Sequence, residues 1–114
     1  MSKVCYLNGE YIAEEKATVP ISDLGLTRGY GIFDFFRTYN GKPFMMEKHL
    51  KRFRNSAFKL RIALKETDDE LVAIVAKLMQ ENQLKDAGIR LVITGGQSTD
   101  GFSPGIPNFF IAVA

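Results

Sequence analysis

The chain has 114 residues, enough for one domain whose hydrophobic core needs no disulfide. Hydrophobic residues make up 46% and charged residues 25%, as in ordinary globular proteins, and no apolar run is long enough to span a membrane. The net charge of +2 does not by itself indicate a nucleic-acid partner. The single cysteine, Cys5, and a start that does not resemble a signal peptide predict a cytoplasmic protein.

The first part of the chain predicts a hairpin followed by a loop. Residues 3–7 and 10–13 read as strands, and Asn8-Gly9 between them favours a tight turn. Residues 15–31 contain Pro20 and a series of glycines, so we predict a loop there.

Residues 31–39 predict a strand, because they are rich in aromatic and β-favouring side chains. Asn40-Gly41 then fits a type I′ turn. Apolar side chains occupy both odd and even positions of the strand, which predicts a strand covered on both faces. Asp34 and Arg37 interrupt the pattern, and in a covered strand each needs a partner because buried charge is costly.

Two amphipathic helices are predicted next, at residues 46–61 and 67–82. Thr67 and Glu70 have the spacing of a capping box at the start of the second helix. Each helix has one apolar stripe for the core. The first stripe is Met46, Leu50, Phe53, Ala57 and Leu60, and the second is Leu71, Ile74, Val75, Leu78 and Met79.

Further strands are predicted at residues 90–94 and 109–114, on either side of a loop at 95–107. Such a long loop is usually functional or lies at an interface. Strands, then two helices, then strands predict an α+β fold, with two helices packed on a mainly antiparallel sheet.

One flank of the first helix is a candidate binding site. His49, Arg52 and Ser56 lie together beside its apolar stripe. An arginine at this rim offers a planar fork to a phosphate or carboxylate. The alternative is that Arg52 pairs with a local acid and that His49, at the edge of the buried helix face, makes its hydrogen bonds within the protein.

The same helix is rich in lysine and arginine, which indicates a solvated face or an anion-binding surface. We expect no nucleic-acid partner, because no recognised nucleic-acid motif accompanies it. We also expect no metal, because no histidines and cysteines have metal-ligand spacing.

Several segments occur in a specific order and spacing. They are Asn8-Gly9, Asp23 with Gly25, Arg28-Gly29-Tyr30-Gly31-Ile32-Phe33-Asp34, then Arg37, Tyr39 and Gly41-Lys42-Pro43-Phe44, and finally His49-Leu50-Lys51-Arg52-Phe53-Arg54-Asn55-Ser56-Ala57. Together they resemble the N-terminal domain of the class IV aminotransferases, the fold-type-IV pyridoxal-phosphate enzymes. That family includes branched-chain and D-amino-acid aminotransferases and aminodeoxychorismate lyase, and the resemblance covers nearly the whole chain.

The resemblance implies a role for three residues. Arg52 occupies the position of the helix arginine that binds the phosphate of pyridoxal phosphate. His49 would order the helix and the surroundings of that phosphate. Phe33 occupies the aromatic position that lines the substrate pocket.

The chain also departs from the family pattern. Arg28 stands where the family often has an aromatic residue, and Asp34 replaces the usual glutamate. Many members have an arginine that reaches the substrate carboxylate after the late strand, where this chain has Gly95 and Gly96. We therefore expect Arg28, Gly95 and Gly96 on the substrate side, with Arg28 as the candidate replacement for that arginine.

The family's Schiff-base lysine lies in a second domain, after the point where this chain ends. The resemblance therefore predicts that residues 1–114 are an N-terminal small domain with no catalytic residue of its own, inactive alone, with open faces on the 32–36 strand and the first helix. The implied protein is a homodimeric aminotransferase that moves an amino group between a branched-chain amino acid and a 2-oxo acid, without a membrane partner. The alternatives are aminodeoxychorismate lyase and a non-catalytic module that binds a phosphorylated small molecule.

Overall fold

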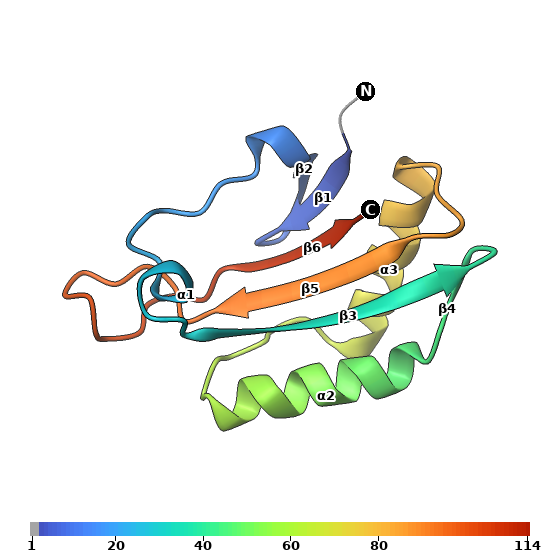
Figure 1. Ribbon diagram of the computed structural model, residues 1–114. Coiled ribbons are helices and arrows are strands. Elements are labelled where there is room, and N and C mark those ends of the chain that lie inside the picture. The colour runs from blue at the N-terminus through green and yellow to red at the C-terminus, as the bar shows by residue number, and fades with distance from the viewer. Residues whose placement is uncertain (1–2) are drawn as a thin grey trace.

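The computed structural model describes residues 3–114, which form one layer of strands and one layer of helices (Figure 1). In chain order the elements are β1 (Val4–Leu7), β2 (Glu10–Ala13), the 3-10 turn η1 (Glu14–Lys16), α1 (Leu24–Thr27), β3 (Gly31–Tyr39), β4 (Lys42–Pro43), α2 (Met46–Lys59), α3 (Asp68–Glu81), β5 (Gly88–Thr94) and β6 (Phe109–Val113).

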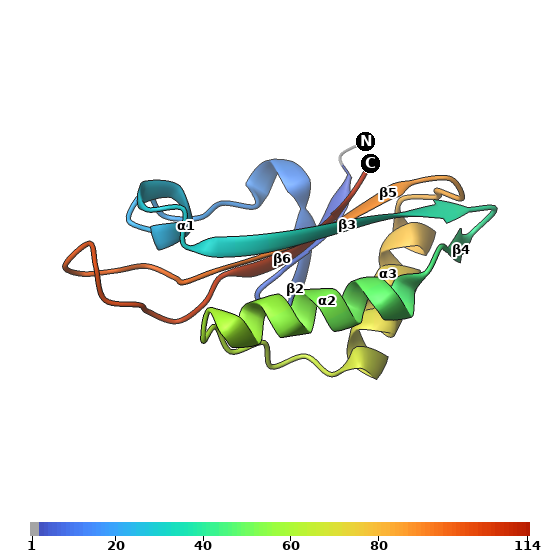
Figure 2. The same cartoon turned by 60° about the horizontal axis from the view of Figure 1, so that its bottom comes forward.

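The six strands form one antiparallel sheet in the order β2-β1-β6-β5-β3-β4. The long helices α2 and α3 cover one face of this sheet, and no long helix of the described residues covers the other face (Figure 2). This arrangement confirms the predicted α+β fold. Within residues 3–114, no helix is long and apolar enough to cross a membrane.

Both predicted hairpin turns are present. Asn8 and Gly9 have φ values of 49° and 92°, and Asn40 and Gly41 have φ values of 52° and 79°. These left-handed conformations are the ones that a type I′ turn requires, and asparagine and glycine adopt them at low cost.

The core lies between the sheet and the two helices, where the predicted helix stripes pack with one exception. Leu60 is 37% exposed because α2 ends at Lys59. Arg61 then turns the chain with a φ of 59°, so Ile62 is buried in place of Leu60. On the sheet side the core residues alternate along β5 and β6, and they are Ile89, Leu91, Ile93, Phe109, Ile111 and Val113.

The strand β3 has one covered face and one open face. Asp34 and Phe36 are buried toward the helices, whereas Phe33 is 68% and Phe35 is 38% exposed on the opposite face. The apolar pattern predicted cover on both faces, but residues 3–114 cover only one. One face of residues 32–36 is therefore open, and a second domain that would cover it stays a prediction.

The strand β5 begins at Gly88, earlier than the predicted 90–94. Glycine usually weakens a strand, but here the ring of Phe35 occupies the space above it. A Cβ atom added at Gly88 would lie 2.6 Å from Cζ of Phe35. The missing side chain therefore lets Phe35 of β3 lie across β5 on the open face.

The two long loops meet at one end of the sheet, where α1 lies beside the loop between β5 and β6 (Figure 1). The backbone N–H of Leu24 donates to the carbonyl of Gly96 at 2.9 Å. We predicted only loop for residues 15–31 and missed the single helical turn α1. Asp23 caps this turn, because its Oδ1 accepts from the N–H of Gly25 at 2.6 Å.

The predicted capping box at the start of α3 is present. Thr67 Oγ1 accepts from the N–H of Glu70 at 3.1 Å, and Glu70 Oε1 accepts from the N–H of Thr67 at 2.9 Å. Thr67→Ala should lower the free energy of unfolding by about 1 kcal/mol, because it removes the cap. Chemical denaturation measures the change, and Thr18→Ala in an exposed loop is the control. Equal effects of the two substitutions would contradict a stabilising role for the box.

Candidate functional site

A buried carboxylate lies on β3 next to a free edge of the sheet. Among the residues that the structure describes, β5 pairs with β3 from Gly31 to Arg37, whereas β4 pairs only with Thr38 and Tyr39. The alternation of the strand directs Asp34 toward the helix layer, and its side chain is only 2% exposed. Because buried charge is costly, Asp34 needs partners.

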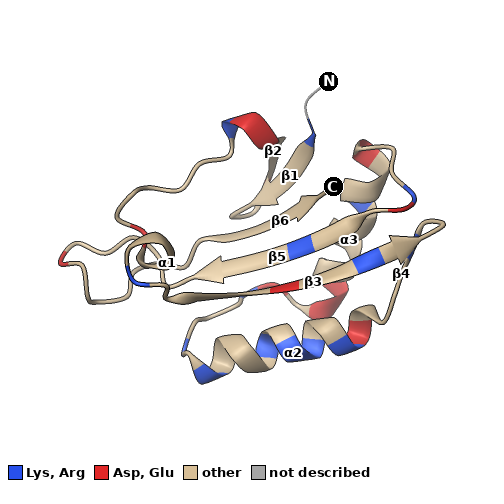
Figure 3. Ribbon diagram, in the orientation of Figure 1, with Lys and Arg blue, Asp and Glu red and all other residues tan. Residues whose placement is uncertain are grey.

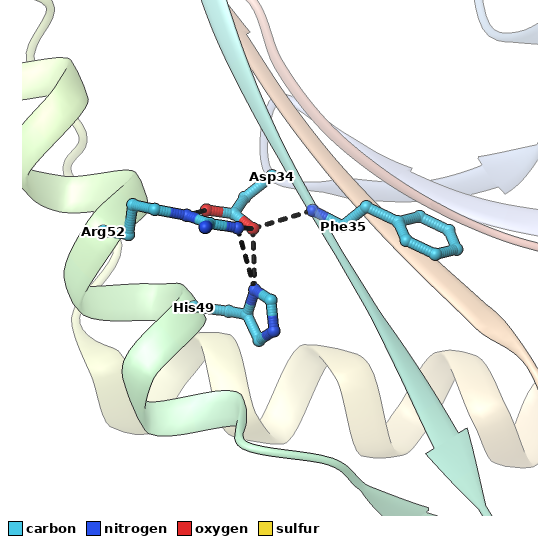
Figure 4. Close-up of polar contacts among 4 residues, drawn as sticks. All are labelled: Asp34, Phe35, His49 and Arg52. Atoms are coloured by element: carbon cyan, nitrogen blue, oxygen red, sulfur yellow. Dashed lines mark hydrogen bonds and ion pairs between the residues drawn. The ribbon is translucent and has the colours of Figure 1, made fainter.

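The partners of Asp34 come from α2 and from the next residue of β3 (Figure 4). Arg52 donates from Nε to Oδ2 at 2.8 Å and from Nη2 to Oδ1 at 2.7 Å. His49 Nδ1 lies 2.8 Å from Oδ1, and we assign it as a donor because the carboxylate only accepts. The N–H of Phe35 donates to the same oxygen at 2.9 Å. The cluster therefore satisfies a buried charge with four polar contacts.

The electrostatics keep Asp34 and Arg52 ionised. Burial alone would raise the pKa of Asp34, but the hydrogen bonds from Arg52, His49 and Phe35 and the charge of Arg52 outweigh it, so this pKa lies below its usual value. The hydrogen bond and the charge of Asp34 in turn raise the pKa of Arg52. The contact is therefore an ion pair at neutral pH.

The structure brings His49 and Arg52 together. It also shows that Arg52 pairs with a nearby acid, which was the alternative to a free arginine, and that this acid is Asp34. Pairing leaves part of Arg52 available, since its side chain is 66% exposed. Within residues 3–114, Nε and Nη2 donate to Asp34, and Nη1 has no protein acceptor. Arg52 can therefore hold Asp34 and still present donors to an anion.

The open face of the sheet contains a shallow hollow of about 540 Å³. Phe33, Val92 and Phe110 contribute apolar walls, and Arg90 contributes a guanidinium. The structure thus places Phe33 at a hollow of suitable size for a small molecule. Arg90 was not predicted from the sequence, although its alternation with apolar neighbours in β5 places it on the face opposite the core.

Asp23 lies at one end of this hollow and is fully buried. Its Oδ2 accepts from Thr94 Oγ1 at 2.8 Å and from Asn108 Nδ2 at 2.5 Å, and its Oδ1 accepts from Gly25. Asp23 therefore links α1 to the adjacent ends of β5 and β6. An aspartate at an N-cap position is one local sequence signal for Asp23. No local signal indicates that Thr94 and Asn108, 71 and 85 residues away, are its partners.

Gly95 and Gly96 are buried where the two loops cross. A Cβ at Gly95 would lie 2.5 Å from the ring of Tyr30, and one at Gly96 would overlap the carbonyl of Ile106. Their N–H groups donate to the carbonyl of Tyr30 and to Thr94 Oγ1. The glycines are therefore required for packing, and their contact with a substrate stays a prediction.

Arg28 lies apart from the Asp34 cluster and outside the residues that line the hollow. Its guanidinium carbon is 4.9 Å from the centre of the Phe102 ring, a cation–π contact between the two loops. Arg28 and Phe102 are both exposed. A role for Arg28 at a substrate stays a prediction.

Comparison with known proteins defines the family. The family model for amino-transferase class IV matches residues 31–114. The chain is 39% identical over 108 residues to a "Putative branched-chain-amino-acid aminotransferase" of Methanocaldococcus jannaschii, covering 92% of this chain and 38% of that protein. It is 38% identical over 96 residues to a D-alanine aminotransferase of Staphylococcus epidermidis, covering 84% and 34%.

Among solved structures, the branched-chain amino acid aminotransferase from Escherichia coli matches with a TM-score of 0.91 and 26% identity, over 100% of this chain and 41% of that one. The chain belongs to the class IV aminotransferase family. It spans 34–41% of the length of these three proteins.

The ion pair makes the stability of the fold depend on pH. Asp34→Asn should lower the free energy of unfolding by about 1–3 kcal/mol at pH 7, because it weakens charged hydrogen bonds to a buried group. Since the pKa of Asp34 is lowered in the folded protein, its contribution is complete above the unfolded value of about 4 and is lost as the pH falls through the folded value.

Denaturation of the two proteins between pH 2 and 7 measures this effect. The gap between wild type and Asp34→Asn should be widest above about pH 5 and should shrink below about pH 4. If the free energies of unfolding of the two proteins differ by the same amount at every pH, the charge of Asp34 does not contribute to stability.

Proposed function

We propose that residues 1–114 form the N-terminal small domain of a pyridoxal-phosphate-dependent class IV aminotransferase. The observation that carries the proposal is the state of Arg52. A buried acid fixes one edge of its guanidinium, and the side chain is still 66% exposed at the free edge of β3. An arginine with a free edge suits a phosphate group.

The donors near this edge fit the phosphate of the cofactor. Arg52 offers Nη1, and exposed Lys48 and Lys51 lie near it on α2, whose basic residues follow the length of the helix (Figure 3). When bound, pyridoxal phosphate supplies the electron-accepting ring that amino-group exchange requires. In this proposal Arg52 binds the phosphate, and His49 keeps Asp34 in place.

The hollow on the open face suits an amino acid with a branched aliphatic side chain. Phe33, Val92 and Phe110 would contact the aliphatic part and exclude water, while Arg90 offers donors for a carboxylate. The names of the Methanocaldococcus jannaschii and Escherichia coli relatives support branched-chain amino acids and 2-oxo acids as the substrates. Arg28, Gly95 and Gly96 complete the proposed substrate side.

In this proposal the catalytic lysine belongs to a second domain that faces the open side of β3. Residues 1–114 alone are then expected to bind and orient a phosphate group but to show no transaminase activity. Aminodeoxychorismate lyase has weaker support than aminotransferase, because a relative of that name, from Bacillus subtilis, is 35% identical over 99 residues, less than the two aminotransferases compared above. A cytoplasmic location and a homodimeric state stay predictions.

Arg52→Ala in the two-domain protein should weaken binding of pyridoxal phosphate by about ten- to a hundredfold, because it removes a charged, directional contact. Lys59→Ala is the matched control, since it removes one exposed positive charge from the last residue of the same helix, about two turns away from Arg52. Equilibrium dialysis measures cofactor retention, and denaturation checks that each variant is folded. Equal losses in the two variants would contradict a specific role for Arg52.

We also expect the chain to self-associate. Exposed apolar side chains lie on the open face and on the loops, among them Phe33 (68%), Phe102 (71%), Ile21 and Ile106 (both 88%). Apolar surface of this kind drives association. Sedimentation equilibrium at micromolar concentration should show a dimer or larger species, weakened in Ile106→Ser but not in Val72→Ser on α3. A constant monomer mass up to high concentration would contradict this expectation.

A further inference from the structure

The contact between Asp34 and Arg52 uses a specific edge of the guanidinium. Asp34 engages the Nε and Nη2 edge, with one oxygen on each nitrogen. Nη1 and the outer hydrogen of Nη2 form the adjacent edge, which points away from the carboxylate. Because a guanidinium is planar and rigid, fixing the first edge also fixes the direction of the second.

Asp34 is itself held in place from several sides. The N–H of Phe35 and His49 Nδ1 both bond to Oδ1, and the His49 ring packs against Phe36 with ring centres 5.5 Å apart. Figure 4 shows the side chains of Asp34 and His49 on the α2 side of β3, with the Phe35 ring on the opposite side. The carboxylate therefore has little freedom to move.

Arg52 would be mobile without this contact. It is a long side chain on an exposed helix surface, and such a side chain loses rotamer freedom when it binds a ligand. An arginine that is already oriented loses less of it.

We propose that Asp34 is a positioning residue, which clamps the Nε and Nη2 edge of Arg52 so that the adjacent Nη1 edge is the one that receives a phosphate group. The inference rests on the proposed function, because it takes Arg52 as the phosphate-binding residue. Asp34 offsets the charge of Arg52, so the clamped pair attracts an anion mainly at short range. Longer-range attraction then comes from Lys48 and Lys51 on the same helix.

The Nε–H signals of arginine in a nitrogen-15 NMR spectrum test this directly, because they report exchange with water and the identity of the acceptor. Inorganic phosphate is the probe, and pyridoxamine 5′-phosphate against pyridoxamine is the second probe pair. Arg54 is an internal control on the same helix. Its Nε also donates to a carboxylate, Asp68 Oδ1 at 2.7 Å.

In the wild-type chain, phosphate should shift the Nη signals of Arg52 and leave its Nε–H bonded and slow to exchange. In Asp34→Asn, the Nε–H of Arg52 should exchange at least tenfold faster, and phosphate affinity should fall about threefold or more. Asp34→Glu should restore both properties, because it returns a carboxylate. Loss of protection at Arg54 as well would show a general loss of structure, and the positioning role would be overturned.

The outcomes separate the two proposals. If phosphate binds wild type and Asp34→Asn equally while Arg52→Ala loses binding, the positioning role is wrong and the proposed function stands. If phosphate releases the Nε–H of Arg52 from Asp34, the assignment of the two edges is wrong. If neither probe shifts any Arg52 signal in the wild-type chain, the proposed function fails, and the positioning role fails with it.

Discussion

The charge of Asp34 constrains how α2 lies against the sheet. A carboxylate with a 2% exposed side chain must be compensated, and its side-chain partners both come from α2. The same helix buries Leu50 and Phe53 in the core. Apolar burial therefore brings the helix to the sheet without fixing its position along the strand, while the hydrogen bonds of Asp34 require one position.

This constraint places two surfaces on either side of the free edge of β3. On the helix side, Arg52 presents donors that suit an anion, and on the open side Phe33 and Arg90 border an apolar hollow. Asp23 fixes the far end of that hollow by joining α1 to the ends of β5 and β6. A buried carboxylate thus lies beside each surface, and each carboxylate has side-chain partners distant in sequence.

Local patterns predicted the hairpin turns, both long helices and the capping box, because each depends on residues a few positions apart. They also predicted that Asp34 needs a partner and that Arg52 lies at a rim. The sequence could not show that these two residues meet, or that Arg90 and Phe33 share a hollow, because the register of β3 against α2 and β5 decides both. Leu60 and Gly88 were misjudged for a similar reason: the left-handed turn at Arg61 and the ring of Phe35 override the local pattern.

A double-mutant cycle between Asp34 and Arg52 tests the central claim most directly. Asp34→Asn, Arg52→Gln and the double variant are compared with wild type by the free energy of unfolding at pH 7. The pair Asp34→Asn with Arg54→Gln is the control, since Arg54 pairs elsewhere. We predict that the first double variant is less destabilised than the sum of its single changes, while the control pair is additive. Additive effects for Asp34 and Arg52 would contradict the account.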